Sequence, residues 1–377
     1  DRRNGMNRKK LIAFSLSLAM TVVPVTPAAA GAEQNTEGLQ NAVLDLEFEN
    51  SLEDSSGKGN NGTLSSGEAE YVDGVVGKGL KMNGSSYVNL GNSTDLQPEN
   101  LTLSFWIRPD SDMKGEELLS WNKNEWYTDG WYLSSENDNT PLTLSVGPAK
   151  ANGQPYRVSV SGKRSEFLPT GEWTHIAVTY DKDSKEICFY RNGVKCSTVT
   201  TYGISGESTG VLGSDATMEK SIGYNGPKYK GAYLKASLDE YQLYNDVATP
   251  EEVIALYEES GQTFDRKAVA QADLDKISIP ETTQENLSLP TTGESGSVIS
   301  WSSDNEAVVA ADGTVVRPGV GEKDVTVTLT AEASYLNGEK VTKTYKVTVT
   351  AKQEINITTS SIMGDVTLED DYLVNAA

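Results

Sequence analysis

The sequence predicts an all-β protein built from more than one domain. The chain has 377 residues, which is enough for two or three domains, and its hydrophobic content of 37% is that of a globular protein. Short strand-like runs recur at intervals of about eight to twelve residues and are joined by Gly and Asn turns, a spacing typical of a β-sandwich. The clearest run, LTLSFWIRP at 101–109, alternates apolar and polar residues with the period of a half-buried strand.

The N-terminal segment 1–30 has the composition of a secretory signal. Met6 is followed by Asn7 and the basic residues 8–10, an apolar run at 11–23 and small residues up to Ala30. This order predicts secretion with cleavage after Ala30, and the apolar run is too short for a membrane anchor. The formal net charge is −22, and loss of this basic segment makes the chain more acidic. Such a charge excludes nucleic acid and anionic membranes as partners and favours a neutral ligand.

The remaining elements follow a polar leader at 31–41. Alternation and turn residues predict strands at 42–48, two within 72–91, then 101–108, 143–147, 156–160, a hairpin of 171–181 with 186–199, and a last strand within 221–245. A helix is predicted at 249–260, because Thr249, Pro250 and Glu252 form an N-terminal capping signature.

Two loops combine aromatic and polar side chains in the way that sugar binding requires. Aromatic rings present apolar faces to the C–H groups of a sugar, while amides and carboxylates bind its hydroxyls. In the segment 120–133, Trp126 and Tyr127 have no periodicity that demands burial, whereas Trp121 matches a core position. A second loop within 221–245 is rich in Gly and Tyr. The candidate carbohydrate-binding residues are Asn124, Trp126, Tyr127, Asp129, Trp131, Tyr224 and Tyr229.

The two cysteines, Cys188 and Cys196, flank a turn at Asn192-Gly193. A two-residue turn places them on opposite faces of the hairpin, whereas a three-residue loop with a Gly bulge pairs them directly. The first register leaves two free thiols and the second permits a disulfide, and the sequence leaves both open.

The order of motifs in 42–260 resembles a known family. GKGLKMNGSSYVNLG (77–91), LTLSFWIRP, GEWTHIAVTYD (171–181) and the helix after LDEYQLYN (238–245) are similar to laminin-G-like, concanavalin-A-like jelly-roll modules. The resemblance implies a jelly-roll sandwich that serves as a carbohydrate-binding appendage. It also implies a structural Ca²⁺ that joins the first loop to the last strand, with Asp54, Asn60 and Asp239 as its ligands.

The segment 261–352 resembles the small bacterial Ig-like repeats, which predicts a second, small β-sandwich. Leu287, Leu289, Trp301, Gly313 and Arg317 match that pattern, and Trp301 is expected in the core. The segment 353–377 is similar to a linker and the start of the catalytic domain of secreted β-L-arabinofuranosidases, and it is expected to end in a helix.

No catalytic constellation stands out within the chain. A glycosidase needs two carboxylates at a set distance, and the nearest arrangement is Asp45, Glu47 and Glu49 on the first strand. The lone His175 lacks the partners of a catalytic centre. We therefore expect an extracellular accessory region that targets a covalently attached glycoside hydrolase to polysaccharide. The alternative is an adhesion or protein-binding module, or a structural spacer without a sugar ligand.

Overall fold

The computed structural model describes residues 39, 42–111, 113, 117–121, 130–147, 156–197, 199–202, 219–224, 233–357 and 372–376. The expected signal segment lies outside the described residues. So do five of the candidate sugar-binding residues: Asn124, Trp126, Tyr127, Asp129 and Tyr229.

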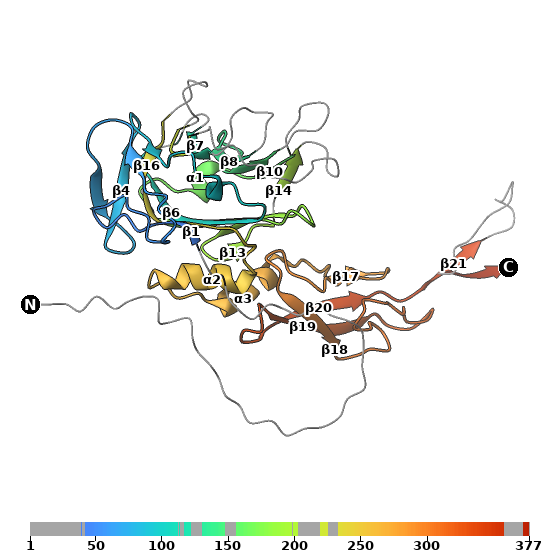
Figure 1. Cartoon of the computed structure of the whole chain (residues 1–377). Coiled ribbons are helices and arrows are strands. Elements are labelled where there is room, and N and C mark those ends of the chain that lie inside the picture. The colour runs from blue at the N-terminus through green and yellow to red at the C-terminus, as the bar shows by residue number, and fades with distance from the viewer. Residues whose placement is uncertain are drawn as a thin grey trace, which may run out of the picture.

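Two antiparallel sheets pack face to face in the N-terminal part of the chain (Figure 1). The first sheet has the order β13-β12-β11-β6-β16-β4-β3, and β1 also pairs with β16. Its strands are β1 (Ala42–Leu46), β3 (Glu70–Asp73), β4 (Lys78–Asn83), β6 (Leu101–Pro109), β11 (Thr174–Tyr180), β12 (Ile187–Arg191), β13 (Val194–Lys195) and β16 (Lys235–Tyr244).

The second sheet has the order β14-β10-β9-β8-β7-β15-β5-β2. Its strands are β2 (Thr63–Leu64), β5 (Val88–Asn89), β7 (Glu117–Trp121), β8 (Trp131–Ser135), β9 (Thr143–Val146), β10 (Tyr156–Val160), β14 (Val199–Tyr202) and β15 (Ser221–Ile222). The segment 72–91 therefore contributes to three strands rather than the two expected. Two short helical turns, η2 (Thr94–Leu96) and α1 (Arg164–Phe167), lie in the connections.

The core of this domain lies between the two sheets and is built by the alternation of each strand. Leu103, Phe105 and Ile107 of β6 point into it, and so do Trp131 and Leu133 of β8. Each of these side chains is fully buried. Burying an apolar side chain of this size contributes about 1.5–3 kcal/mol, so the alternation fixes which face of each strand turns inward.

Helix α2 (Pro250–Glu259) covers the outer face of the first sheet (Figure 1). Its capping box forms as expected, because Thr249 accepts from the amide of Glu252 and the Glu252 side chain accepts from the amide of Thr249. Trp106 points to this outer face and stacks on Tyr257 of α2, with ring centroids 5.5 Å apart. Trp106 is thereby 4% exposed, so it packs beneath α2 and does not line a ligand site.

The C-terminal domain carries one four-stranded sheet of order β17-β20-β19-β18. Its elements are α3 (Arg266–Lys276), β17 (Thr282–Thr283), β18 (Val298–Ser303), β19 (Val325–Ser334) and β20 (Val341–Val349). Helix α3 was not expected, although Asp265 caps it by accepting from the amide of Ala268. Trp301 is partly buried and packs against two apolar clusters of this domain, and its indole nitrogen donates to the Pro290 carbonyl.

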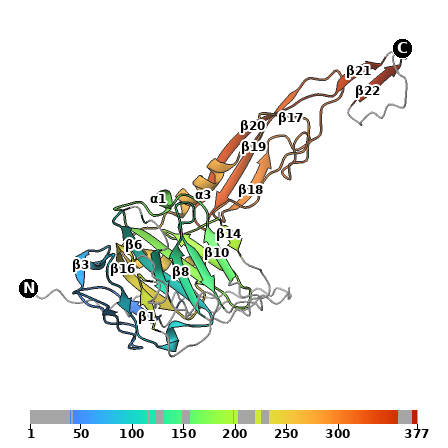
Figure 2. The ribbon, with the colours of Figure 1, turned by 90° about the horizontal axis from the view of Figure 1, so that it is seen from above.

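The two domains share a continuous apolar contact through α2 and α3. Ile254 and Tyr257 of α2 belong to the same cluster as Phe264, Leu274 and Tyr335. In Figure 2 the second domain extends away from the first, with α3 at their junction. Helix α2 therefore contacts the first sheet on one side and the second domain on the other. The part of the first sheet beneath α2 is not open to a ligand.

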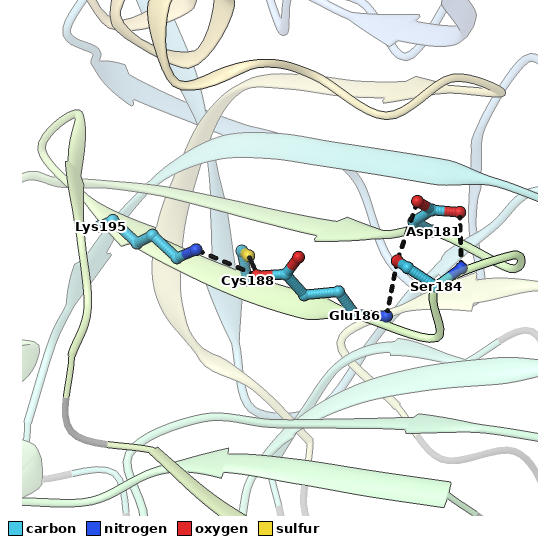
Figure 3. Close-up of polar contacts among 5 residues, drawn as sticks. All are labelled: Asp181, Ser184, Glu186, Cys188 and Lys195. Atoms are coloured by element: carbon cyan, nitrogen blue, oxygen red, sulfur yellow. Dashed lines mark hydrogen bonds and ion pairs between the residues drawn. The ribbon is translucent and has the colours of Figure 1, made fainter. Parts of the chain in front are cut away.

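The cysteine hairpin adopts the two-residue turn. Arg191 pairs with Val194, and both cysteines are free. Cys188 donates to the carboxylate of Glu186, and the ammonium of Lys195 binds the same oxygen, each at 3.1 Å (Figure 3). Cys196 packs instead against the core between the two sheets. The hairpin therefore does not bring the thiols together.

The tail contains β21 (Gln353–Ile357) and β22 (Tyr372–Ala376), which pair in parallel. The prediction of a helix at the end of the chain is wrong, since residues 372–376 form a strand. No helix among the described residues has the length and apolar composition needed to cross a membrane.

Candidate functional site

The outer face of the second sheet is mostly polar along β8, β9 and β10. The residues that alternate with the core there are Tyr132, Ser134, Thr143, Ser145, Arg157 and Ser159, and all of them except Arg157 are buried. Thr143 and Ser159 share a hydrogen bond of 2.7 Å, whereas the buried hydroxyls of Ser134 and Ser145 have no hydrogen-bond partner in the described structure. Because these hydroxyls are buried, this part of the face does not offer them to a ligand in solvent, and a candidate site has to be sought elsewhere on the sheet.

A cluster of three tyrosines stands on the same sheet, next to β5 and β15. The rings of Tyr87 and Tyr224 stack with centroids 5.0 Å apart, and those of Tyr224 and Tyr233 stack at 4.5 Å with an interplanar angle of 8°. Tyr87 and Tyr233 are half-buried, while Tyr224 is 7% exposed. We call Tyr87, Tyr224 and Tyr233 the tyrosine cluster. Its two outer rings are the part of it that a ligand in solvent reaches.

Strand register explains how this cluster forms. Val88 pairs with Ile222, and both side chains are fully buried in the core. Tyr87 is adjacent to Val88, so alternation turns its ring to the outer face. Tyr224 follows Ile222 by two residues, and Ser221 holds that turn by donating its hydroxyl to the Tyr224 carbonyl. Two short strands far apart in sequence thus bring their tyrosines together.

An open polar pocket of about 470 Å³ adjoins the cluster at the sheet edge. Asn89 of β5 lies two residues after Tyr87, on the same outer face, and pairs with Thr63 of the edge strand β2. The pocket is lined by Gly59, Asn60, Asn61, Thr63, Asn89, Leu90, Gly91, Asn92, Ser93 and Glu219. Its side chains are mostly amides and hydroxyls, which bind sugar hydroxyls as donors and acceptors.

The protonation of the cluster suits hydrogen bonding at neutral pH. Burial raises the pKa of Tyr87, and the negative charge of Glu219 raises it further. Burial likewise raises the pKa of Tyr224, with a smaller contribution from Tyr233. Both hydroxyls therefore stay protonated and remain donors well above neutral pH.

Two predicted sugar-binding residues, Trp131 and Tyr224, lie within the described residues. The prediction for Trp131 is wrong, because its side chain is fully buried in the core and its indole nitrogen donates to the Leu96 carbonyl at 3.2 Å. No ligand in solvent reaches it. Tyr224 is the central member of the tyrosine cluster. The sequence analysis did not select Tyr87, because it lies outside the two loops chosen for their composition. The feature that could have identified it is an aromatic residue on the polar side of a predicted strand.

The predicted calcium ligands Asp54 and Asn60 are engaged by other groups. The Asp54 carboxylate accepts from the amides of Asp45, Ser56 and Asn60 and from the Ser56 hydroxyl, all within 2.9 Å. These four donors match the four lone-pair sites of a carboxylate. The Asn60 side chain donates to the Val43 carbonyl at 2.7 Å. Asp54 therefore organises the first loop through these hydrogen bonds.

Asp239 is engaged in the same way. It is fully buried, and its Oδ2 accepts from the amides of Val75 (2.7 Å) and Val76 (3.0 Å) while Oδ1 accepts from Glu240 (3.0 Å). Burial raises the pKa of Asp239 to about 6, and the three amide donors act in the opposite direction. Within the described ranges there is no group of three or more His, Cys, Asp or Glu side chains arranged to hold a metal. The three residues in this arrangement do not fit a Ca²⁺ site.

The calcium that the family resemblance implied at these residues is untested, and chelation shows whether it binds despite this arrangement. Because amide and hydroxyl donors already occupy most of the oxygen lone pairs, we expect excess EDTA to leave the melting temperature of the full chain unchanged. The measurement is thermal unfolding by circular dichroism with EDTA, with CaCl₂ and with neither. A fall of several degrees in EDTA that CaCl₂ restores, and MgCl₂ does not, would establish the metal despite these hydrogen bonds.

The carboxylates of the first strand and His175, which were considered as catalytic residues, have structural roles. Strand β1 ends at Leu46, and the positive φ of Phe48 breaks the alternation that would have aligned Asp45, Glu47 and Glu49. Glu49 instead accepts from the amide of Lys78. His175 is buried against the Ser104 hydroxyl at 2.9 Å, and burial lowers its pKa to about 3, so it is neutral at physiological pH.

Comparison with known proteins assigns both domains. Residues 82–254 match the concanavalin A-like lectin/glucanases superfamily, and residues 267–352 match the atrophied bacterial Ig domain. The chain therefore carries a concanavalin A-like domain followed by a bacterial Ig-like domain, and the predicted all-β fold class is confirmed. A segment of 126 residues is 36% identical to an alpha-L-arabinofuranosidase of Bifidobacterium longum subsp. longum. That match covers 27% of this chain and 12% of the relative.

Two solved structures illustrate the likeness to known structures, both at low identity. Domain 4 of AbnA, a GH43 extracellular arabinanase from Geobacillus stearothermophilus in complex with arabinotriose, is 23% identical, with a TM-score of 0.41 over 58% of this chain and 99% of that domain. The binding domain of Paraclostridial Mosquitocidal Protein 1 is 18% identical, with a TM-score of 0.45 over 78% of this chain and 64% of that one.

Proposed function

We propose that the concanavalin A-like domain binds carbohydrate at the tyrosine cluster and its polar pocket, and that it holds an attached glycoside hydrolase on its polysaccharide. The observation that carries the proposal is the half-buried ring of Tyr87, stacked in one cluster with Tyr224 and Tyr233, next to an amide-lined pocket of about 470 Å³. Aromatic rings left partly exposed on a sheet face supply an apolar surface for sugar C–H groups, and the amides beside them bind the hydroxyls.

The role of the domain in a longer enzyme is part of the same proposal. The relative that shares 126 residues is an alpha-L-arabinofuranosidase, which supports an attached hydrolase. When the module binds a polymer, it raises the effective concentration of that polymer around the attached enzyme. This raises the turnover of the enzyme on insoluble substrate. The basic, apolar and small-residue order of 1–30 supports export of this protein to an extracellular polymer.

Replacing Tyr87 by alanine tests the site. We expect Tyr87→Ala in the full chain to weaken polysaccharide binding about tenfold, which corresponds to about 1.4 kcal/mol of lost ring contact. The measurement is calorimetric titration with arabinan, after a screen of arabinan, xylan, galactan and mucin-type glycans. Tyr71→Ala is the matched control, because Tyr71 is also half-buried but lies on the first sheet.

The outcomes separate the proposal from its rivals. Loss of affinity in Tyr87→Ala with unchanged affinity in Tyr71→Ala supports the tyrosine cluster as the sugar site. Equal affinity in both variants and the parent chain would remove this site. Failure of every glycan to bind, together with tight binding to a protein, would replace carbohydrate binding with adhesion.

A further inference from the structure

Glu219 lies where the tyrosine cluster meets the polar pocket. It lines the pocket, and its charge acts on the hydroxyl of Tyr87. Its side chain is exposed, just before the buried strand β15. A ligand that rests on Tyr87 and reaches into the pocket therefore passes this carboxylate.

Two of the pocket amides, those of Asn61 and Asn89, offer donors rather than acceptors. The side-chain oxygen of Asn61 accepts from the amide of Asp54 at 2.8 Å, and that of Asn89 accepts from the amide of Gly91 at 2.7 Å. Their amide N–H groups are what remains for a ligand. Glu219 is thus the strong acceptor of the pocket, and a carboxylate accepts two hydroxyl donors at once through its two oxygens.

Lys220 places a positive charge next to the lining of this pocket, but no part of its side chain is exposed to a ligand. Lys220 is fully buried, and its ammonium donates to the Asn92 carbonyl at 3.2 Å. Glu219 is the one ionisable side chain among the residues that line the pocket in the described structure. A ligand carboxylate in the pocket would therefore meet a like charge, within a chain whose net charge is −22.

We infer that Glu219 selects neutral sugars that carry two neighbouring hydroxyls and rejects sugars that carry a carboxylate. This inference rests on the proposed sugar site, and it adds the class of ligand and the residue that sets it. The amides of Asn61 and Asn89 donate to ring or hydroxyl oxygens, Glu219 accepts from the hydroxyl pair, and Tyr87 supports the apolar face of the sugar.

The test compares arabinan with lightly carboxymethylated arabinan, and uses hydroxyethylated arabinan as the neutral match. We expect the full chain to bind arabinan at least tenfold more tightly than the carboxymethylated polymer. Glu219→Gln keeps the shape of the side chain but removes its charge. It should bind arabinan about fivefold more weakly and reduce the preference to less than threefold. In the parent chain 1 M NaCl should also shrink the preference, because salt screens repulsion at an exposed site.

Glu172→Gln is the control, since Glu172 is exposed in the loop before β11, away from the lining of the pocket. Its affinity for each of the two polymers should equal that of the parent chain. An unchanged preference in Glu219→Gln, or equal binding of the two polymers by the parent chain, overturns the role of Glu219. If Tyr87→Ala loses arabinan while Glu219→Gln does not change the preference, sugar binding stands and this inference fails. If neither polymer binds the parent chain, the proposed function fails with it.

Discussion

Asp239→Ala is expected to lower the free energy of unfolding of the concanavalin A-like domain by about 3 kcal/mol. The fully buried carboxylate accepts three backbone amides, and two of them belong to the connection between β3 and β4. Each buried amide left without an acceptor costs about 1–3 kcal/mol, which water entering the small cavity only partly restores. In a domain of this size that loss lowers the melting temperature by about 6–12 °C.

Backbone geometry makes this position hard to replace. Glu240 has a positive φ of 46°, and the pairing of β16 with β6 shifts register between Asp239 and Gln242. This bulge accompanies the contact of the carboxylate with the loop. Gly74 permits the close approach, since a Cβ at that position would lie 2.4 Å from the Asp239 carboxylate.

Urea unfolding followed by tryptophan fluorescence measures the effect, with Asp73→Ala as the control. The Asp73 side chain is 92% exposed and pairs only with Lys78 among the described contacts, so its loss should leave the stability almost unchanged. Equal stabilities of the Asp239 and Asp73 variants would show that the three amides find other acceptors.

Much of the fold follows from local rules that the sequence displays. Alternation identified β6, β9, β10 and β11 because one face of each strand must be buried to stabilise the sheet. The capping signature located α2 because Thr249 and Glu252 satisfy the same amides in any surroundings. Helix α3 was not predicted because its sequence, RKAVAQADLDK, has little amphipathic contrast, and it packs on β19 and β20, which come much later in the chain.

The candidate site could not be derived in the same way, because it depends on pairing between distant strands. Tyr87 and Tyr224 meet only because Val88 pairs with Ile222, and no local pattern encodes that register. Composition selected the aromatic loops, and one residue from them, Trp131, is instead packed in the core. Whether Cys188 and Cys196 can form a disulfide also depended on strand register. The pairing of Arg191 with Val194 sets the register that keeps them apart. Sequence patterns specify the face of a residue well and its cross-strand neighbours poorly.

Asp45→Asn is expected to stabilise the domain at alkaline pH and to have no effect in acid. Burial, together with the charge of Glu47, raises the pKa of Asp45 to about 6. Its Oδ1 has no hydrogen-bond partner in the described structure. The ionised form of Asp45 is therefore disfavoured in the folded protein relative to the unfolded chain, where the pKa is about 3.8.

The sign of the pH dependence follows from this shift. A folded-state pKa above the unfolded value gives a contribution that is fully present below pH 3.8 and is lost as the pH rises through about 6. At pH 8 the asparagine variant, which carries no charge to bury, should be more stable than the parent by about 2 kcal/mol. The gain should shrink between pH 6 and pH 4 and vanish below that range. Glu70→Gln, an exposed change on β3, should show no such dependence. A gain that is the same at pH 4 and pH 8 would contradict the buried charge as its cause, because only the ionisation of Asp45 distinguishes the two conditions.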